Sequence, residues 1–247
     1  MGNSVSEWQE LGGLEYRPGA SDTANASQAE GRAAIANTLS MSFLDVPTVH
    51  AVTDPRILRD PEFKFKAASV FRALGAAGAV HLRGLGMPVI AVYRLAEFLS
   101  PLQTVTGCLL VINDRVDVAI AVGARGVQLR RTSLSLADAR RAAGQSASRV
   151  RFGVSIHEPS EASAAVADGA AWVMAGNIHE SASHRGRPAR GTEFVRAVAA
   201  TGAIVIAIGG IRAEQAKALR LHGAHGIAAI RGIWDANDPA AAARAYL

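Results

Sequence analysis

Three histidines in polar loop sequence are the residues of this chain best suited to acid–base chemistry. His157, His179 and His184 each follow a short apolar run, and a neutral imidazole transfers protons readily near neutral pH. Their spacing does not match that of a zinc site. His50 lies inside an apolar run and is expected in the core. We therefore expect proton transfer, without a bound metal, at these loops.

Glycines beside two later apolar runs predict a phosphate site. The segment IAIGGI contains Gly209 and Gly210, and the segment AIRGI contains Arg231 and Gly232. Bare backbone N–H groups next to a helix N-terminus bind anions, and a guanidinium matches the geometry of phosphate. The alternative is that the glycines only form tight turns.

A polar pair, Asn113 and Asp114, closes the apolar run LLVIN and opens an amphipathic segment. As a helix N-cap, the pair would satisfy free backbone N–H groups. As a functional pair, it would bind a diphosphate with its Mg²⁺, which usually needs a second carboxylate or the substrate's own phosphates. The later loop LRRTSLS, at 129–135, has no carboxylate, so both interpretations stay open.

Eight apolar runs supply the strands that must position these groups: 49–53, 79–83, 109–113, 126–129, 151–155, 172–175, 204–208 and 226–230. Segments with helical spacing lie between them: 63–74, 89–99, 136–143, 161–167, 194–200 and 213–221. Parallel strands need such crossovers, and strands covered on both faces read as continuous apolar runs. Eight units predict an α/β fold, a (β/α)8 TIM barrel. An open doubly wound sheet would show a glycine fingerprint after its first strand, where DPRILRDPEF stands.

The loops that follow the strands of such a barrel meet at one mouth, where the chemistry lies. Position alone assigns these residues to the mouth: Asp54, Arg83, Asn113, Asp114, Gln128, Ser155, His157, Asn177, His179, Gly209, Gly210, Arg231 and Gly232.

Composition narrows the class of protein. Residues 1–48 hold two arginines and six acidic residues, so the net charge of +5 comes from the remainder and indicates an anionic ligand. Aromatic residues are scarce for nucleic-acid binding, and no apolar run is long enough to span a membrane. The single cysteine, Cys108, excludes an intramolecular disulfide and suits a reduced compartment. We expect a cytoplasmic protein that binds a small phosphorylated molecule; a homo-oligomer stays open.

The N-terminal segment 1–45 is rich in Gly, Ser, Ala and Asn and has no sustained period. Such a segment cannot bury enough apolar surface to offset its ordering entropy. The sequence predicts a flexible, disordered tail at 1–45 ahead of a barrel domain at 46–247.

Several motifs resemble those of the thiamine phosphate synthase and thiazole tautomerase (TenI-type) superfamily. They are HAVTD (50–54), VHLR (80–83), VINDRVDVAIAVGARGVQL (111–129), FGVSIHEPSEA (152–162), SASHRGRPARG (181–191), VIAIGGI (205–211) and HGIAAIRGI (225–233), in family order. The resemblance implies a phosphorylated thiazole or pyrimidine as ligand. It implies that the ligand and its phosphate contact Arg83, Asn113, Asp114, Gln128, Ser155, Ser181, Ser183, Gly209, Gly210, Arg231 and Gly232.

The synthase branch of this family joins a pyrimidine diphosphate to a thiazole phosphate with Mg²⁺, and the sequence departs from its pattern. At the second strand, the synthase pattern has Gln, Arg and Lys. This chain has His81, Arg83 and Leu85 at those positions, so only the arginine is kept. The second magnesium carboxylate falls at Ser133, and the loop lysine after the sixth strand is His184. Asp114 would be the remaining metal ligand.

The tautomerase branch moves a proton on a thiazole carboxylate phosphate and needs no metal or other cofactor. Its members also show VQL followed by a loop that contains serine. Its acid–base histidine corresponds to Asn177, so we expect His179, two residues later, or else His184, to take that role. A metal-independent, tautomerase-like enzyme is the leading hypothesis. A divergent Mg²⁺-dependent thiamine-phosphate synthase and a non-catalytic regulator that binds a phosphometabolite are the alternatives.

Overall fold

Eight parallel strands form the centre of the fold. The computed structural model describes residues 46–180 and 188–247, so the predicted tail at 1–45 lies outside the described residues. The strands are β1 (Val49–Val52), β2 (Gly78–Leu82), β3 (Leu109–Asn113), β4 (Gly126–Leu129), β5 (Arg151–Ile156), β6 (Trp172–Ala175), β7 (Val205–Ile208) and β8 (Gly226–Ala229). Each pairs in parallel with the next, and β8 pairs with β1 to close the barrel. The predicted (β/α)8 barrel is confirmed, with every strand within one residue of its predicted bounds.

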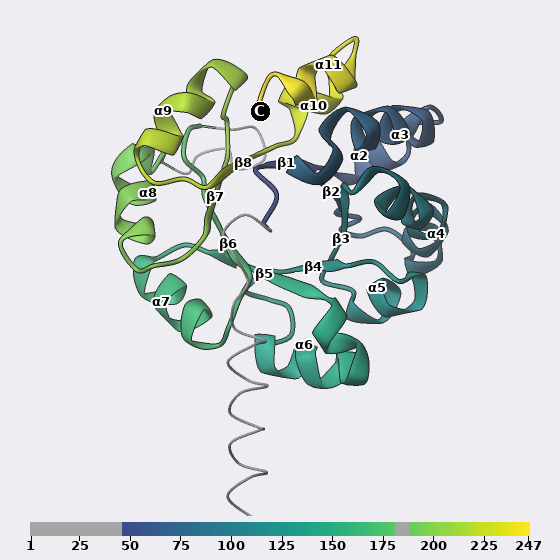
Figure 1. Ribbon diagram of the computed structural model, residues 1–247, viewed down its shortest axis with the longest axis horizontal. Coiled ribbons are helices and arrows are strands. Elements are labelled where there is room, and N and C mark those ends of the chain that lie inside the picture. Colours follow the sequence, from purple (N-terminus) through teal and green to yellow (C-terminus); the bar gives the residue numbers. More distant parts are fainter. Residues whose placement is uncertain (1–45, 181–187) are drawn as a thin grey trace, which may run out of the picture. The chain divides into compact units, whose positions relative to one another are not determined.

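Helices surround the ring of strands (Figure 1). They are α2 (Pro55–Leu58), α3 (Phe63–Leu74), α4 (Val89–Thr106), α5 (Val116–Val122), α6 (Leu136–Ala143), α7 (Pro159–Ala167), α8 (Gly191–Ala199), α9 (Ala216–Leu221), α10 (Arg231–Trp234) and α11 (Pro239–Arg244). Among the described residues, no helix is long and apolar enough to cross a membrane.

Helix α4 is longer than its sequence pattern predicts. The expected end was Leu99, but the helix continues past Pro101 to Thr106. Gly107 then ends it in the left-handed conformation, with φ of 78°, which costs glycine nothing because it lacks a Cβ. The extension places Gln103 where its side-chain amide donates to Gly123 O at 2.7 Å, which fixes the end of α5.

The described residues form two apolar clusters, one on each side of the strands. The larger cluster fills the space between the barrel and its helices. The smaller cluster fills the barrel interior with side chains that point inward, including Val52, Val111, Trp172, Met174 and Ile206. Because the interior is packed, a ligand is confined to the ends of the barrel.

Candidate functional site

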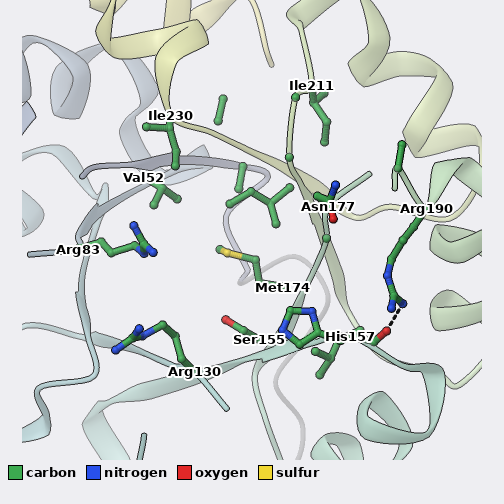
Figure 2. Close-up of a pocket in the computed structure, with 18 of the residues that line it drawn as sticks. Val52, Arg83, Arg130, Ser155, His157, Met174, Asn177, Arg190, Ile211 and Ile230 are labelled. Carbon is green, nitrogen blue, oxygen red and sulfur yellow. Dashed lines mark hydrogen bonds between the residues drawn. The ribbon is translucent and has the colours of Figure 1, made fainter. Parts of the chain in front are cut away.

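A cavity of about 1360 Å³ opens at the carboxyl ends of the strands. Its wall includes nine residues that sequence position had assigned to the mouth: Arg83, Asn113, Ser155, His157, Asn177, Gly209, Gly210, Arg231 and Gly232. Met174 also lines the cavity and lies near the centre of the view in Figure 2, between Arg83 and Asn177. The predicted mouth residues Asp54, Asp114, Gln128 and His179 are not part of the described wall.

The cavity wall is strongly basic. Among the described residues, six arginines line it: Arg83, Arg130, Arg131, Arg190, Arg212 and Arg231. Against them, the described wall has two carboxylates, Glu158 and Glu180. A concave surface with this charge attracts anions and concentrates them at the opening. Arg83 and Arg130 lie on one side of the cavity in Figure 2, and Arg190 lies on the other.

Arg83 brings an unpaired cation to this wall. Its backbone N–H donates to Thr53 Oγ1 at 3.0 Å, and Thr53 Oγ1 donates to His81 O at 2.8 Å, so the main chain is fixed. Its guanidinium has no hydrogen bond or ion pair with any residue that the structure describes. Burial lowers the pKa of Arg83, and the positive charge of Arg130 lowers it further. An anionic ligand would relieve both effects.

Asp114 does not cap a helix, which corrects one of the two interpretations of the Asn113-Asp114 pair. The N-cap position of α5 belongs to Arg115, and Asp114 has a left-handed backbone with φ of 64°. Its Oδ2 accepts from Arg130 Nε at 2.6 Å, and its Oδ1 accepts from Arg130 N at 3.2 Å and from the Ser133 hydroxyl. The carboxylate is thus directed at the loop after β4.

These contacts do not suit the Mg²⁺ site that the synthase pattern implies. Both oxygens of Asp114 already accept hydrogen bonds, and the residue expected as the second carboxylate is Ser133. Mg²⁺ prefers carboxylate oxygens and phosphates, whereas the nearest charged neighbour of Asp114 is the Arg130 guanidinium. Within the described ranges, no three His, Cys, Asp or Glu side chains gather as a metal site.

A polar chain in the barrel interior supports Ser155. Trp172 Nε1 donates to Gln128 Oε1 at 2.8 Å, and Gln128 Nε2 donates to Ser155 Oγ at 3.0 Å. Gln128 is fully buried and both ends of its amide are used, so it positions Ser155 rather than facing the cavity. Since Ser155 Oγ accepts from Gln128, its own hydroxyl proton is available to a ligand. Gly153 makes room for this chain, because a Cβ there would lie 2.1 Å from Trp172 Nε1.

Two fully buried histidines form a second polar chain. His50 Nε2 donates to Pro47 O at 3.0 Å, and His81 Nε2 then donates to His50 Nδ1 at 2.8 Å. The Asn113 side chain is the next neighbour of His81 and lines the cavity. Burial lowers the pKa of His50 to about 4 and the pKa of His81 well below its usual range, so both rings are neutral near pH 7. The expectation that His50 belongs to the core is confirmed.

This pair predicts a loss of stability in mild acid. The unfolded chain binds a proton at His50 near pH 6.5, whereas the folded chain does not until about pH 4. Stability is therefore complete above about pH 7.5 and falls as the pH drops through 6.5 toward 4. For His50 alone, we expect the free energy of unfolding at pH 5 to be about 2 kcal/mol lower, measured by urea denaturation.

The matched variant is His50→Gln, which keeps polar atoms at this position but cannot titrate. Its free energy of unfolding should fall less steeply between pH 7.5 and pH 5 than that of the unsubstituted chain. Equal slopes for the two proteins would remove His50 from the explanation.

The loop after β6 packs against the loop after β7. His179 N donates to Gly209 O at 2.9 Å, and Ile178 N donates to Ile208 O at 2.9 Å. Gly210 has φ of 65°, and a Cβ there would lie 2.2 Å from Glu180 O. The glycine pair is therefore required by this close packing as well as available to a ligand. Ser181, Ser183 and His184 lie outside the described residues.

Tyr246 holds the loop after β7 at the cavity mouth. The Tyr246 hydroxyl is buried and donates to Ile211 O at 3.0 Å, in the loop after β7. A Cβ at Gly232 would lie 2.2 Å from this hydroxyl. Gly232 thus makes room for this hydroxyl, and the adjacent Arg231 lies exposed on the cavity wall.

Four arginines of the described wall were missed by the sequence prediction: Arg130, Arg131, Arg190 and Arg212. Arg130 follows Gln128 by two positions, and side chains two apart in a strand point to the same side, which is the signal that could have found it. Arg190 donates to His157 O and, at 2.9 Å, to Glu158 Oε1, and its guanidinium stacks on Phe194. No local pattern reveals that role, since its partners belong to the loop after β5.

Most of the barrel is similar in sequence to one family of known proteins. The profile of the thiamine monophosphate synthase family matches residues 49–233. The thiamine-phosphate synthase of Gloeobacter violaceus is 39% identical over 164 residues, which are 65% of this chain and 46% of that protein. That of Roseiflexus castenholzii is 34% identical over 199 residues, which are 80% of this chain and 85% of that protein. The chain therefore spans about half of the first relative and most of the second.

A solved structure shows the same likeness. The thiamine phosphate pyrophosphorylase from Pyrococcus furiosus superposes with a TM-score of 0.71 at 27% sequence identity, over 83% of this chain and 96% of that one.

Proposed function

We propose, because the chain belongs to the thiamine monophosphate synthase family, that it joins a pyrimidine diphosphate to a thiazole phosphate in this cavity. In that reaction the thiazole nitrogen attacks the pyrimidine methylene carbon. A C–N bond forms, the C–O bond to the diphosphate breaks, and pyrophosphate leaves.

The observation that carries the proposal is the distribution of basic residues around one large cavity. Arg83 and Arg130 lie after β2 and β4, while Arg231 lies with the glycines of the loops after β7 and β8. Two phosphorylated ligands could then bind with their anionic groups on opposite sides. The cavity of about 1360 Å³ exceeds the range of roughly 300–1,000 Å³ usual for one small ligand.

The arginines supply the electrostatic part of the reaction. Negative charge develops on the departing pyrophosphate, and fixed cations stabilise it most when they need no rearrangement. Asp114 holds the Arg130 guanidinium in place before the ligand binds, and the hydrogen bond from Arg83 N to Thr53 Oγ1 fixes the main chain from which the Arg83 guanidinium extends. Ser155 and Asn113 offer a hydroxyl proton and a carbonyl oxygen from the wall; the buried Asn113 Oδ1 has no partner among the described residues.

A thiazole tautomerase is the second candidate, as the sequence pattern had favoured, although the relatives named above carry the synthase name. The observation in its favour is that Asp114 is bound by Arg130 and Ser133, which suits a reaction without metal. The proton would need a histidine at the cavity. His157 lines the wall, while His179 and His184 remain predictions from the sequence.

One set of assays separates these functions. The purified chain is incubated with the pyrimidine diphosphate and the thiazole phosphate, and release of pyrophosphate and formation of thiamine phosphate are measured. A parallel assay follows aromatisation of the thiazole carboxylate phosphate. Product in the first assay supports the synthase, and product in the second alone supports the tautomerase. Binding of these ligands without turnover in either assay would instead support the non-catalytic regulator.

A further inference from the structure

Arg130 is held in place while most of its hydrogen-bonding capacity stays free. Its Nε and its backbone N–H are bound to Asp114. Its two terminal nitrogens have no hydrogen bond with any residue that the structure describes, and the side chain is 31% exposed at the cavity wall. A guanidinium has five N–H donors, so four of them remain for a ligand.

Asp114 and Ser133 orient this guanidinium. The Asp114 carboxylate accepts from Arg130 through both of its oxygens, and the Ser133 hydroxyl donates to Oδ1 of the same carboxylate. Ser133 Oγ also accepts from Arg130 N at 3.0 Å. The three residues therefore form one closed network, and the left-handed backbone of Asp114 keeps the carboxylate turned toward β4.

Arg83 lies near enough to Arg130 for the two charges to repel each other, and the charges of Asp114 and Asp54 offset this repulsion and the effect of burial only in part, so the pKa of Arg83 stays lowered. Asp114 is paired with Arg130 and attracts Arg83 without forming an ion pair with it, so the two arginines keep an excess of positive charge that is costly in the absence of a ligand. The pair is suited to a compact anion with two or more negative charges, which would accept from both guanidinium groups at once.

We propose that Arg130, positioned by Asp114 and Ser133, stands in for a divalent cation, so that Arg83 and Arg130 bind the diphosphate end of the ligand without Mg²⁺. The inference rests on the proposed function for the choice of a diphosphate. Asp114 is then a positioning residue for Arg130 and not a metal ligand.

Titration calorimetry with inorganic pyrophosphate tests this on the full chain. We expect dissociation constants in EDTA and in millimolar Mg²⁺ to agree within about threefold. Arg130→Gln should weaken binding in EDTA at least tenfold. The control is Arg125→Gln, which removes the same charge at the opposite end of β4, where Arg125 contacts Thr104; its binding should change less than twofold. Thermal unfolding verifies that each variant is folded.

A double variant that should restore a Mg²⁺ site tests the inference in the opposite direction. Arg130→Gly combined with Ser133→Asp removes the internal cation and gives two facing carboxylates, the ligands that Mg²⁺ prefers. Pyrophosphate should then bind this variant at least tenfold better with Mg²⁺ than in EDTA. Binding to the unsubstituted chain that requires Mg²⁺, or an Arg130→Gln variant that binds like Arg125→Gln, would overturn the inference. Because the assay needs no turnover, failure of the proposed reaction would leave this result unaffected.

Discussion

Replacing Arg83 by glutamine should lower kcat/KM about 100-fold or more while leaving the protein at least as stable. The guanidinium forms no hydrogen bond or ion pair in the described chain, and burial lowers its pKa, which the charges of Asp114 and Asp54 offset only in part, so its charge is a cost to the fold until an anion binds. Two charge-assisted hydrogen bonds to phosphate would be lost, worth about 3 kcal/mol together. Steady-state kinetics and urea denaturation on the same preparation measure both effects.

Arg83→Lys is the matched variant for this prediction. It keeps the charge but loses the planar pair of donors, so an intermediate loss of about tenfold is expected. A parallel fall in stability and activity for Arg83→Gln would contradict the prediction, since it would mean that Arg83 has a structural partner. A lysine variant as poor as glutamine would show that donor geometry matters more than charge.

The substitution Gly153→Ala should have the largest effect on stability, about 4 kcal/mol. The added Cβ would lie 2.1 Å from Trp172 Nε1 and 2.5 Å from Gln128 Oε1. The indole is 1% exposed inside a packed barrel and has no room to move. Overpacking and the loss of a buried hydrogen bond add together, and the Ser155 hydroxyl also loses its support. Urea denaturation measures the change in the free energy of unfolding.

Trp172→Leu provides the control, because it removes the indole, with which the new methyl group collides most closely, and it frees the Gln128 side chain to shift away from the methyl group. In that background, Gly153→Ala should cost less than about 1 kcal/mol, although Trp172→Leu is itself destabilising. Additive effects of the two substitutions would mean that the contact with the indole is not the cause.

The strands could be predicted from sequence because each one carries its own signal. A strand covered on both faces is apolar throughout, so runs such as WVMA at 172–175 stand out from the polar loops around them. Each strand can therefore be recognised from its own residues, and eight repeats of the strand–helix unit predict a closed barrel. The short helices α2, α10 and α11 were not predicted; α2 and α10 have four residues each, which are too few for a periodic pattern, and α11 is a run of alanines without a polar face.

The site was less predictable because its contacts join residues far apart in the chain. A local rule made Asp114 a candidate N-cap, whereas its partners Arg130 and Ser133 come from the next βα loop. Similarly, His50 could be assigned to the core, but its partner His81 is known only from the pairing of β1 and β2. Sequence gives the residue types at the mouth, and tertiary packing decides which of them face the cavity.

The hydrogen bond of Tyr246 affects when the cavity can form during synthesis of the chain. The barrel closes when β8 pairs with β1, and the Tyr246 hydroxyl then adds a hydrogen bond to Ile211 O in the loop after β7, which also packs against the loop after β6. During synthesis, β1 must therefore wait with an unpaired edge until some 180 further residues have left the ribosome. The cavity would then be the last part of the barrel to form on the nascent chain, so no partly synthesised barrel would bind its ligand.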